Sequence, residues 1–295
     1  MQGASLREIP FNRGVAVLNR IPSPTPLPSG VPHKPTAFAS MSDLSPPSAV
    51  AADRKLLITL MTYNESENVE PLIAEIRKVA PTAQILVVDD NSPDGTGRIV
   101  DRLAAADPTI HVLHRPGKLG LGTATIAAMT YAQAHGYELM LNMDADFSHP
   151  PRFLPGILAG MDKHDITIGS RYAPGGGTQN WPRARLIISR AVNTMVRFFF
   201  RMPIRDASGA FRCYRVSMLR NAHLERTQSR GYSFQQEVLF RCHIAGAKLG
   251  ESPIIFENRR AGKSKVNTKE ALRSIAMILW FGIHHFFGLD DYRKR

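Results

Sequence analysis

The chain has 295 residues, 43% of them hydrophobic, which suits one large globular domain or two small ones. Its formal net charge of +12 and pI near 10 indicate an anionic partner: nucleic acid, an acidic membrane surface or a phosphorylated substrate. Only two cysteines, Cys213 and Cys242, are present, which excludes a disulfide framework and a cysteine-rich metal cluster and favours reduced thiols in a cytoplasmic protein.

The N-terminal segment differs in composition from the rest. Residues 1–52 hold nine of the 21 prolines and show no apolar periodicity, so we expect a disordered leader. The segment lacks the continuous apolar run of a signal peptide, and translation from Met41 is an open alternative. No apolar run later in the chain reaches the roughly 20 residues that span a bilayer.

From Lys55 onward, short apolar runs alternate with stretches of helical periodicity. Apolar strands that alternate with helices predict a mainly parallel sheet with helices on both faces. Ligands of such sheets bind beyond the carboxyl ends of the strands, and polar residues gather at those positions in this sequence. The strands that we predict span 56–60, 85–88, 110–114, 139–143 and 165–169.

The strongest cluster of polar residues follows the fourth predicted strand, in residues 142–151. Asp144 and Asp146 stand one residue apart there, and paired carboxylates suit a hard cation such as Mg²⁺ or Mn²⁺. A cation that also touches a diphosphate would neutralise the charge that develops on a leaving nucleotide. The alternative is a helix N-cap with a spare acid, ahead of the helix that follows Pro150.

Two further clusters follow the first and second predicted strands. Asp89 and Asp90 lie where hydrogen bonds could hold a base or a ribose, although the next five residues also form an ideal turn. Tyr63 could lie against a base while Glu65 meets its polar edge; the alternative for Tyr63 is a place in the core.

These three segments, in this order and spacing, resemble the family 2 glycosyltransferases of the GT-A fold. Five more segments narrow the resemblance to the polyprenol-phosphate (dolichyl-phosphate) mannosyltransferases. The resemblance implies a catalytic domain over 53–265, followed by a C-terminal amphipathic helix or tail over 266–295. The additional segments are 115–123, 168–172, 206–212, 231–235 with Glu237, and 259–265.

The resemblance implies GDP-mannose as the sugar donor. It implies a Mg²⁺ or Mn²⁺ ion at Asp144 and Asp146, with Ser148 as a weaker ligand at a position where family members often carry Gln. Catalytic roles are implied for Asp144, Asp146, Arg171 and Arg260. The residues implied to bind the nucleotide sugar are Thr62, Tyr63, Glu65, Val88, Asp89, Asp90, Lys118, Asp144, Ala145, Asp146 and Ser148.

The implied acceptor is a dolichyl or polyprenyl phosphate. A lipid phosphate is already an anion near neutral pH, so it needs cations to position it and no strong general base. The implied reaction is one displacement with inversion, which gives a β-linked lipid phosphate mannose. The candidate residues for the acceptor phosphate are Arg171, Arg185, Ser189, Arg260, Lys263 and Lys265.

The segment 185–201 predicts a basic amphipathic helix, suited to the interface of an anionic membrane. The segment 274–289 is largely apolar and could form a second interfacial element. We therefore expect a peripheral protein on the cytoplasmic face of a membrane; the alternative is that both segments are ordinary core helices. The apolar side of the first helix is predicted to consist of Ile188, Ala191, Val192, Met195 and Phe199.

Two other functions stay open at this stage. A UDP-glucose-dependent polyprenyl-phosphate glucosyltransferase would keep the fold and change the sugar, although related enzymes usually carry transmembrane helices after the catalytic domain. A basic nucleic-acid-binding module would need aromatic residues among its Lys and Arg patches or a recognisable binding fold, and neither is evident.

Overall fold

The structure is a computed structural model that describes residues 55–227, 229, 233–259, 276, 279, 280 and 282–284. The predicted leader, most of the predicted C-terminal tail, and the candidate residues Arg260, Lys263 and Lys265 lie outside the described residues.

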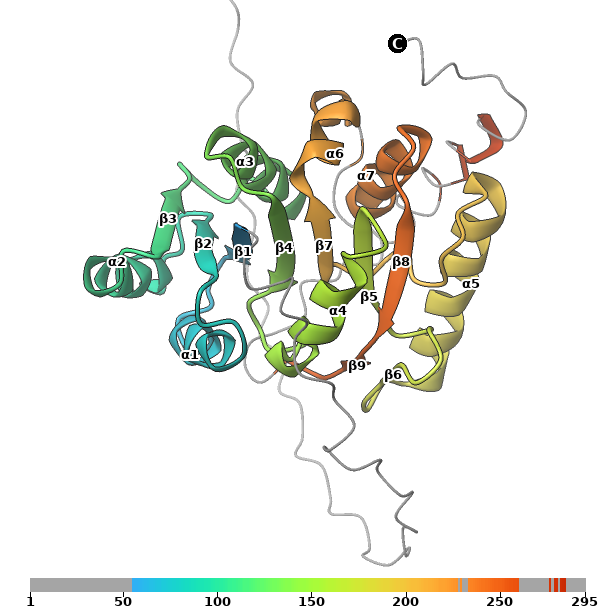
Figure 1. Ribbon diagram of the computed structural model, residues 1–295. Helices are drawn as coiled ribbons and strands as arrows, with labels where there is room; N and C mark the ends of the chain where they lie inside the picture. The colour runs from blue at the N-terminus through green and yellow to red at the C-terminus, as the bar shows by residue number, and fades with distance from the viewer. Residues whose placement is uncertain are drawn as a thin grey trace, which may run out of the picture. The chain divides into compact units, whose positions relative to one another are not determined.

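A seven-stranded sheet forms the centre of the described chain (Figure 1). Its strands are β1 (Leu56–Thr62), β2 (Gln84–Asp89), β3 (Ile110–His114), β4 (Leu139–Asp144), β5 (Ile166–Ser170), β7 (Arg212–Arg215) and β8 (Leu249–Pro253). Their order is β3-β2-β1-β4-β7-β5-β8. β7 is antiparallel to both of its neighbours, and every other pair in this sheet is parallel. A second, short sheet pairs β6 (Gly177–Thr178) with β9 (Ile255–Phe256).

Helices cover both faces of the large sheet, so it is buried on each side (Figure 1). One hydrophobic cluster packs α1, α2 and α4 against the sheet, and the other packs α3, α5, α6 and α7 against the opposite face. The helices are α1 (Val69–Val79), α2 (Thr96–Ala106), α3 (Leu121–Ala134), α4 (Leu154–Gly160), α5 (Arg183–Phe200), α6 (Val216–Asn221) and α7 (Ser233–Ile244), with 3₁₀ turns at Pro151–Phe153 and Leu224–Arg226.

The five predicted strands are all present, with ends that differ by at most two residues, and the prediction of a mainly parallel sheet with helices on both faces is confirmed. β7 and β8 were not predicted. β7 contains two arginines among its four residues, and β8 reads Leu-Gly-Glu-Ser-Pro, so neither shows the apolar run of a buried strand.

The helix predicted over 185–201 is present as α5, and none of the five residues on its predicted apolar side is buried in the core. Asn193, Val196 and Phe200 face the protein, because this side packs against the same cluster as α7. Of the predicted apolar side, Ile188 is 60% exposed, and its neighbour Ile187 is 66% exposed. Within the described chain, no helix combines the length and the apolar character that crossing a bilayer requires.

Candidate active site

The carboxyl ends of the parallel strands meet at one edge of the sheet, here called the carboxyl edge. The loops that follow β1, β2 and β4 each contain a residue in the left-handed region: Asn64, Asn91 and Phe147, with φ of 57°, 56° and 65°. Asparagine tolerates this conformation, whereas for a bulky residue it costs roughly 1–2 kcal/mol. Phe147 is 4% exposed and packs into the core on the α1 and α4 face, which holds the strained loop in place.

The strained loop carries the predicted carboxylate pair. Asp144 is the last residue of β4, and the Asp146 carboxylate accepts a hydrogen bond from the backbone N–H of Ser148 at 3.0 Å. The first helical segment after the loop begins at Pro151, and no side chain caps it. The alternative interpretation of these acids as a helix N-cap is therefore wrong.

His149 fixes the backbone of Asp144. Its ring is 2% exposed, stacks on Phe211 with a centroid distance of 5.0 Å, and meets Phe256 edge-on. Burial lowers the pKa of His149, so its Nδ1 accepts a hydrogen bond from the backbone N–H of Asp144 at 3.0 Å. Burial raises the pKa of Asp144, and the nearby Asp146 carboxylate raises it further.

The oxygen atoms around this loop form a set that fits a hard cation. Two carboxylates whose charges repel each other gain from a cation between them. The Ser148 hydroxyl adds a third oxygen, since it is buried and has no hydrogen-bond partner among the described residues. The guanidinium of Arg259 lies 3.4 Å from the Asp146 carboxylate. In the described chain, no group of three or more His, Cys, Asp or Glu side chains gathers as a metal cluster, so such a cation would rely on oxygens of other kinds.

Asp89 and Asp90 lie at the carboxyl edge, but their carboxylates face protein groups. The hydroxyl of Thr62 donates to Asp89 at 2.8 Å, and the backbone N–H of Ser92 donates to it at 3.0 Å. Asp90 accepts from Arg115 at 2.5 Å and from the backbone N–H groups of Leu119 and Gly120. These contacts hold the loops after β1, β2 and β3 together. The two acids predicted to touch a nucleoside thus also hold the loops around them in place.

The remaining predicted donor-side residues lie close to these two acids. The ammonium of Lys118 lies 4.3 Å from the ring centroid of Tyr63, a cation–π geometry that joins the loops after β1 and β3. Glu65 accepts from the side chain of Asn68 at 2.9 Å. The Val88 side chain is fully buried in the core, so only its backbone can serve a ligand.

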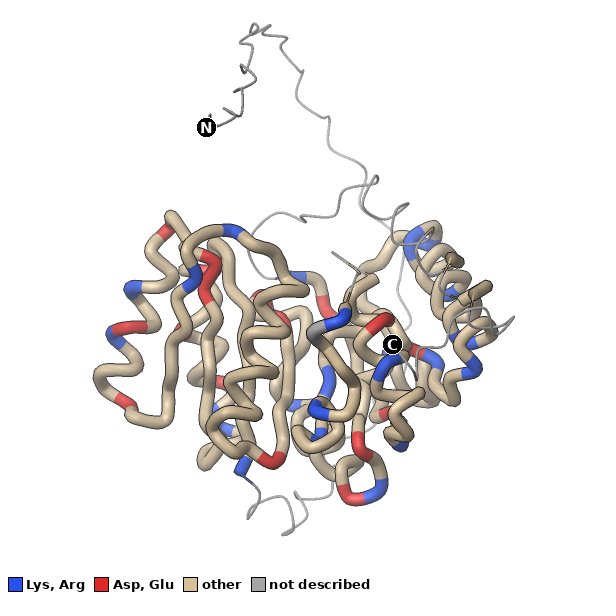
Figure 2. Tube along the Cα trace, turned by 90° about the horizontal axis from the view of Figure 1, so that it is seen from above, with Lys and Arg blue, Asp and Glu red and all other residues tan. Residues whose placement is uncertain are grey.

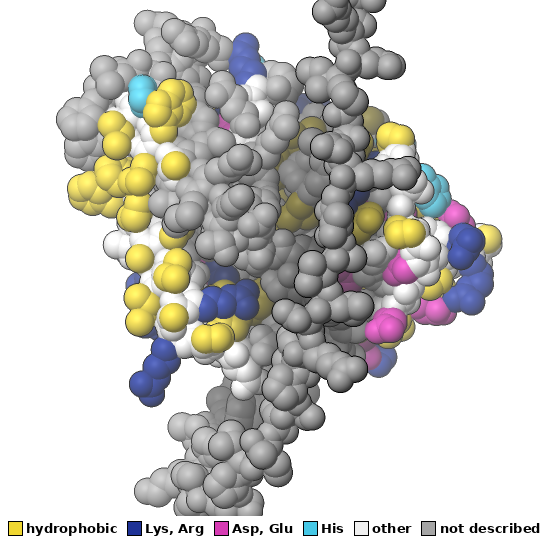
Figure 3. Space-filling model, turned by 180° about the vertical axis from the view of Figure 1, so that it is seen from behind, with side chains coloured by type: hydrophobic (Ala, Val, Ile, Leu, Met, Phe, Trp, Pro, Cys, Tyr) yellow, Lys and Arg dark blue, Asp and Glu magenta, His cyan; other side chains and the backbone are white. Residues whose placement is uncertain are grey.

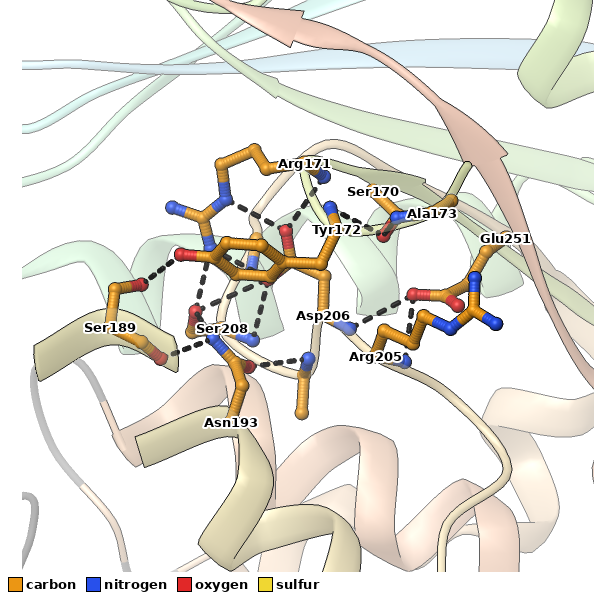
Figure 4. Close-up of polar contacts among 12 residues, drawn as sticks. Ser170, Arg171, Tyr172, Ala173, Ser189, Asn193, Arg205, Asp206, Ser208 and Glu251 are labelled. Carbon is orange, nitrogen blue, oxygen red and sulfur yellow. Dashed lines mark hydrogen bonds and ion pairs between the residues drawn. The ribbon is translucent and has the colours of Figure 1, made fainter. Parts of the chain in front are cut away.

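Arg171 lies at the carboxyl edge beyond β5, in a buried ion pair with Asp206 (Figure 4). Its Nε and Nη2 donate to the two oxygens of Asp206 at 2.7 and 2.6 Å, and Nη2 also donates to Ser208. Burial alone would raise the pKa of Asp206, but the Arg171 charge more than offsets this and the pKa is lowered. The charge of Arg171 is thereby fixed in one place, and part of its hydrogen-bonding capacity is used inside the protein.

The other described candidates for the acceptor phosphate gather beside Arg171. The guanidinium of Arg185 lies 3.8 Å from the ring centroid of Trp181, and that of Arg171 lies 5.3 Å from the same ring. The Tyr172 hydroxyl donates to the Ser189 hydroxyl at 2.7 Å, which ties α5 to the loop after β5 (Figure 4). The structure thus joins Arg171 and Arg185 through Trp181, and links Ser189 to Arg171 through Tyr172, whose ring centroid lies 5.4 Å from the Arg171 guanidinium.

The sequence analysis missed several residues of the site. His149, Trp181 and Arg259 are such cases; Arg259 belongs to a basic segment in which Arg260 was the predicted residue. His149 lies in the segment 142–151 and Arg259 in the segment 259–265, but the sequence does not indicate which of several neighbouring residues reaches a carboxylate. The sequence does offer a signal for Asp206, the partner of Arg171, because it is the acid that begins the segment 206–212.

The family model described as glycosyl transferase family 2 matches residues 58–226 of the chain. A polyprenol monophosphomannose synthase of Mycolicibacterium smegmatis is 40% identical over 235 residues, which cover 78% of this chain and 89% of that protein. An undecaprenyl-phosphate mannosyltransferase of Micrococcus luteus is 41% identical over 213 residues, which cover 72% of this chain and 88% of that protein.

Solved structures of a glucosyl-3-phosphoglycerate synthase from Mycobacterium tuberculosis share the fold. The structure with Mn²⁺, UDP and glucosyl-3-phosphoglycerate has a TM-score of 0.56 at 15% identity, over 88% of this chain and 87% of that one. The structure of the same enzyme with Mn²⁺, UDP and phosphoglyceric acid has a TM-score of 0.57. This likeness concerns the fold, and the GT-A fold expected from the sequence is confirmed.

Proposed function

The chain belongs to glycosyl transferase family 2 and is a glycosyltransferase, and from this premise we propose that it transfers mannose from GDP-mannose to a dolichyl or polyprenyl phosphate. The observation that carries the proposal is that the carboxyl edge has two chemically different parts, one on each side of the Asp144–Asp146 loop. Acids and an aromatic ring suited to a nucleoside lie before the Asp144–Asp146 loop, and arginines suited to a phosphate lie after it. Relatives at about 40% identity whose names describe mannose and polyprenyl phosphates support the choice of substrates.

The reaction is one displacement at the anomeric carbon. An oxygen of the acceptor phosphate forms a bond to that carbon while the bond to the diphosphate of GDP breaks, and the configuration inverts from α to β. The phosphate is already ionised at neutral pH, so no general base is required. Arg171 and Arg185 position the acceptor, and their donors match phosphate oxygens. Arg260, Lys263 and Lys265 are proposed for the same role.

The leaving diphosphate carries the charge that must be neutralised. Asp144, Asp146 and Ser148 are proposed to hold a Mg²⁺ or Mn²⁺ ion there, which as a Lewis acid would stabilise the departing GDP. The unpartnered Ser148 hydroxyl supports this donor set. Arg259 lies 3.4 Å from Asp146 and adds a positive charge from the protein on the same side. His149 orients Asp144 through its backbone N–H.

We assign Asp89, Asp90, Thr62, Tyr63 and Glu65 to the guanosine. Asp89 and Asp90 are already held by protein donors, so their carboxylates are fixed in place before the nucleotide arrives. Lys118 lies over the ring of Tyr63, and we assign it to a base or a phosphate of the nucleotide. Val88 and Ala145 would contribute through their backbone.

The acceptor is a lipid, and the proposal includes peripheral attachment to the cytoplasmic face of a membrane. Exposed apolar side chains gather on α5 and on the described residues near Trp280 (Figure 3). α5 carries arginines and no acid, in contrast to the acid-bearing end around α1 and α2 (Figure 2). A basic, apolar helix surface suits the interface of an anionic bilayer. The exposed residues are Ile187, Ile188, Phe198, Trp280 and Ile283.

The substrates are tested by incubating the purified full chain with undecaprenyl phosphate, Mg²⁺ or Mn²⁺, and labelled GDP-mannose, GDP-glucose, UDP-glucose or UDP-galactose in separate reactions. We expect an organic-phase mannosyl lipid from GDP-mannose, with GDP released in equal amount. A product from UDP-glucose and none from GDP-mannose would overturn the choice of donor.

The membrane surface is tested by flotation with vesicles of phosphatidylcholine, with and without phosphatidylglycerol. The double change Ile187→Ser with Phe198→Ser should lower binding to the anionic vesicles by roughly tenfold or more, because two large side chains would no longer enter the interface. Leu119→Ser is the matched control, since Leu119 is 55% exposed but lies away from α5. Equal binding by both variants would contradict the assignment of α5.

A further inference from the structure

Buried polar side chains without a partner are few in the described chain, and Gln235 differs from the others. Its side chain belongs to a residue that is 4% exposed, and neither its Nε2 nor its Oε1 has a hydrogen-bond partner among the described residues. Each unpartnered buried polar atom destabilises the folded protein, so an amide that lacks both bonds calls for an explanation. The other such atoms are Ser148 Oγ, Thr167 Oγ1, Trp181 Nε1, Arg212 Nε and Tyr214 Oη.

Gln235 lies in the first turn of α7, and the topology places this turn at the carboxyl edge. α7 leads into β8, which runs parallel to β5, so the helix ends at the opposite edge and begins at the carboxyl edge. The first turn of α3 is close by, because a Cβ added at Gly122 would lie 3.0 Å from the side chain of Phe234. The loop before α3 carries Lys118, a candidate residue for the donor.

Helix α7, which contains Gln235, packs on the sheet face to which the Asp144 side chain points. The guanidinium of Arg212 donates to the backbone oxygen of Gln235 at 2.6 Å, and Arg212 pairs with Asn142 in the neighbouring strand. Side chains alternate along a strand, so Asn142 and Asp144 point to one face. Met61, the register partner of Asp144, packs into the cluster formed with α3 and α7, which identifies that face.

The chemistry of the unpartnered amide selects its ligand. A carboxamide offers N–H donors and an oxygen acceptor. A sugar hydroxyl satisfies both, because it accepts one hydrogen bond and donates another. An ionised phosphate accepts only and would leave Oε1 without a donor. Between the nucleoside region and the acceptor arginines, the group that must occupy the edge during transfer is the hexose.

We propose that the side-chain amide of Gln235 hydrogen-bonds a hydroxyl of the hexose that is transferred, and that Gln235 is a specificity-determining residue of the enzyme. The inference rests on the proposed function and extends it from the substrate class to a contact with the sugar. A site built to bond a hydroxyl discriminates strongly against an analogue that lacks it, because the amide is then left unpaired.

The test combines Gln235→Met with GDP-mannose and its 2-, 3-, 4- and 6-deoxy analogues, with undecaprenyl phosphate as the acceptor. Methionine keeps the length of the side chain and removes both polar atoms. We expect kcat/KM for GDP-mannose to fall roughly ten- to a hundredfold in this variant. With the wild type, kcat/KM for one deoxy analogue should be lower than for GDP-mannose by a similar factor. With the variant, the same analogue should lower kcat/KM little further. Inhibition by GDP should stay unchanged.

Thr167→Val is the matched control. Thr167 is fully buried and its hydroxyl also has no partner among the described residues, but this side chain faces Gly160, the last residue of α4, away from the carboxyl edge. Both variants should unfold at the same temperature as the wild type or higher, and only Gln235→Met should lose activity.

Three outcomes would overturn the inference. The first is unchanged activity in Gln235→Met. The second is that each deoxy analogue lowers kcat/KM by the same factor in the wild type and in the variant, so that the losses add. The third is a lower unfolding temperature for Gln235→Met alone, which would show that the amide has a structural partner. A wild type that does not use GDP-mannose at all would instead refute the proposed function.

Discussion

The two halves of the sheet treat their buried polar groups differently. In the half formed by residues 55–144, every buried side-chain polar atom that the structure describes has a partner; the unpartnered atoms all belong to residues 148–235. The first half holds Asp89 and Asp90 in a closed set of hydrogen bonds. The second half leaves Ser148 and Gln235 with free hydrogen-bonding capacity.

The difference indicates how far the polar groups of each half are already hydrogen-bonded before a substrate binds. A network whose members satisfy one another is rigid and shaped in advance, which suits recognition of a nucleotide that is common to many reactions. Unpartnered groups carry a free-energy cost that a substrate can remove when it binds. The second half therefore holds most of the groups that we propose for the metal, the sugar and the lipid phosphate, and Asp144 at the boundary completes the proposed metal ligands.

The largest expected effect on the rate of transfer is at the boundary between the halves, and the effects on stability follow. Asp146→Asn removes one charge from the proposed cation site, and transfer should fall at least about a hundredfold, equivalent to roughly 3 kcal/mol of transition-state stabilisation. The fold should persist, because the change relieves repulsion with Asp144. Initial rates and thermal unfolding check the two statements. Full activity of Asp146→Asn would contradict the proposed cation site in the Asp144–Asp146 loop.

The next effect compares the buried ion pair of each half. Asp206→Asn leaves the Arg171 charge without its carboxylate and should lower the free energy of unfolding by about 3–5 kcal/mol. Asp90→Asn should cost about 3 kcal/mol or less, because Arg115 keeps contacts to Thr123 and to the backbone oxygen of Gly120. Urea denaturation measures both values. A larger loss for Asp90→Asn would reverse the comparison.

The pH dependence of the unfolding free energy tests the buried ion pair of the second half separately. The pKa of Asp206 is lowered in the folded protein from its ordinary value of 3.8. Its contribution to stability is therefore present above about pH 4 and is lost as the pH falls through the lower, folded pKa. The unfolding free energy of Asp206→Asn should depend less on pH than that of the wild type between pH 5 and pH 2. Parallel curves for the two proteins would contradict the pairing with Arg171.

The smallest effect uses one threonine in a strand of each half. Thr59 in β1 donates to the backbone oxygen of Leu141 at 3.3 Å, whereas the Thr167 hydroxyl in β5 has no partner among the described residues. Thr59→Val should destabilise by about 0.5–1 kcal/mol, and Thr167→Val should be neutral or stabilise by a similar amount. Calorimetry resolves such differences. The same sign for both variants would show that the halves do not differ in this respect.

The first half of the fold was readily predicted from the sequence, and the second half only in part. Apolar runs such as 85–88 end in acids, so the pattern identifies both the strand and the functional side chain that follows it. β7 gives no such signal, because Arg212 is a charged residue in a buried place. Its charge is stabilised by the backbone oxygens of Ala207 and Gln235, which lie 5 and 23 residues away in the sequence, and by the Asp206 carboxylate.

The same limit applies to the site. Asp144 and Asp146 were found because both acids stand in one short segment. The partnership of Arg171 with Asp206 spans 35 residues and needs the antiparallel course of β7 to bring the loop before it to the carboxyl edge. The inward position of Asn193 on α5 was not predicted either, because its donation to Ser208 at 3.0 Å joins residues 15 positions apart.

The position of β7 between β4 and β5 also orders the assembly of the molecule in time. Strands β1 to β4 can pair as soon as residue 144 has left the ribosome, but β5 has no partner strand until residues 212–215 follow it. During that interval the edge of β4 is open to wrong pairing, a hazard for an unfinished sheet. Pulsed hydrogen exchange should therefore find β1 and β4 protected before β5 and β8; simultaneous protection would show that the sheet closes in one step.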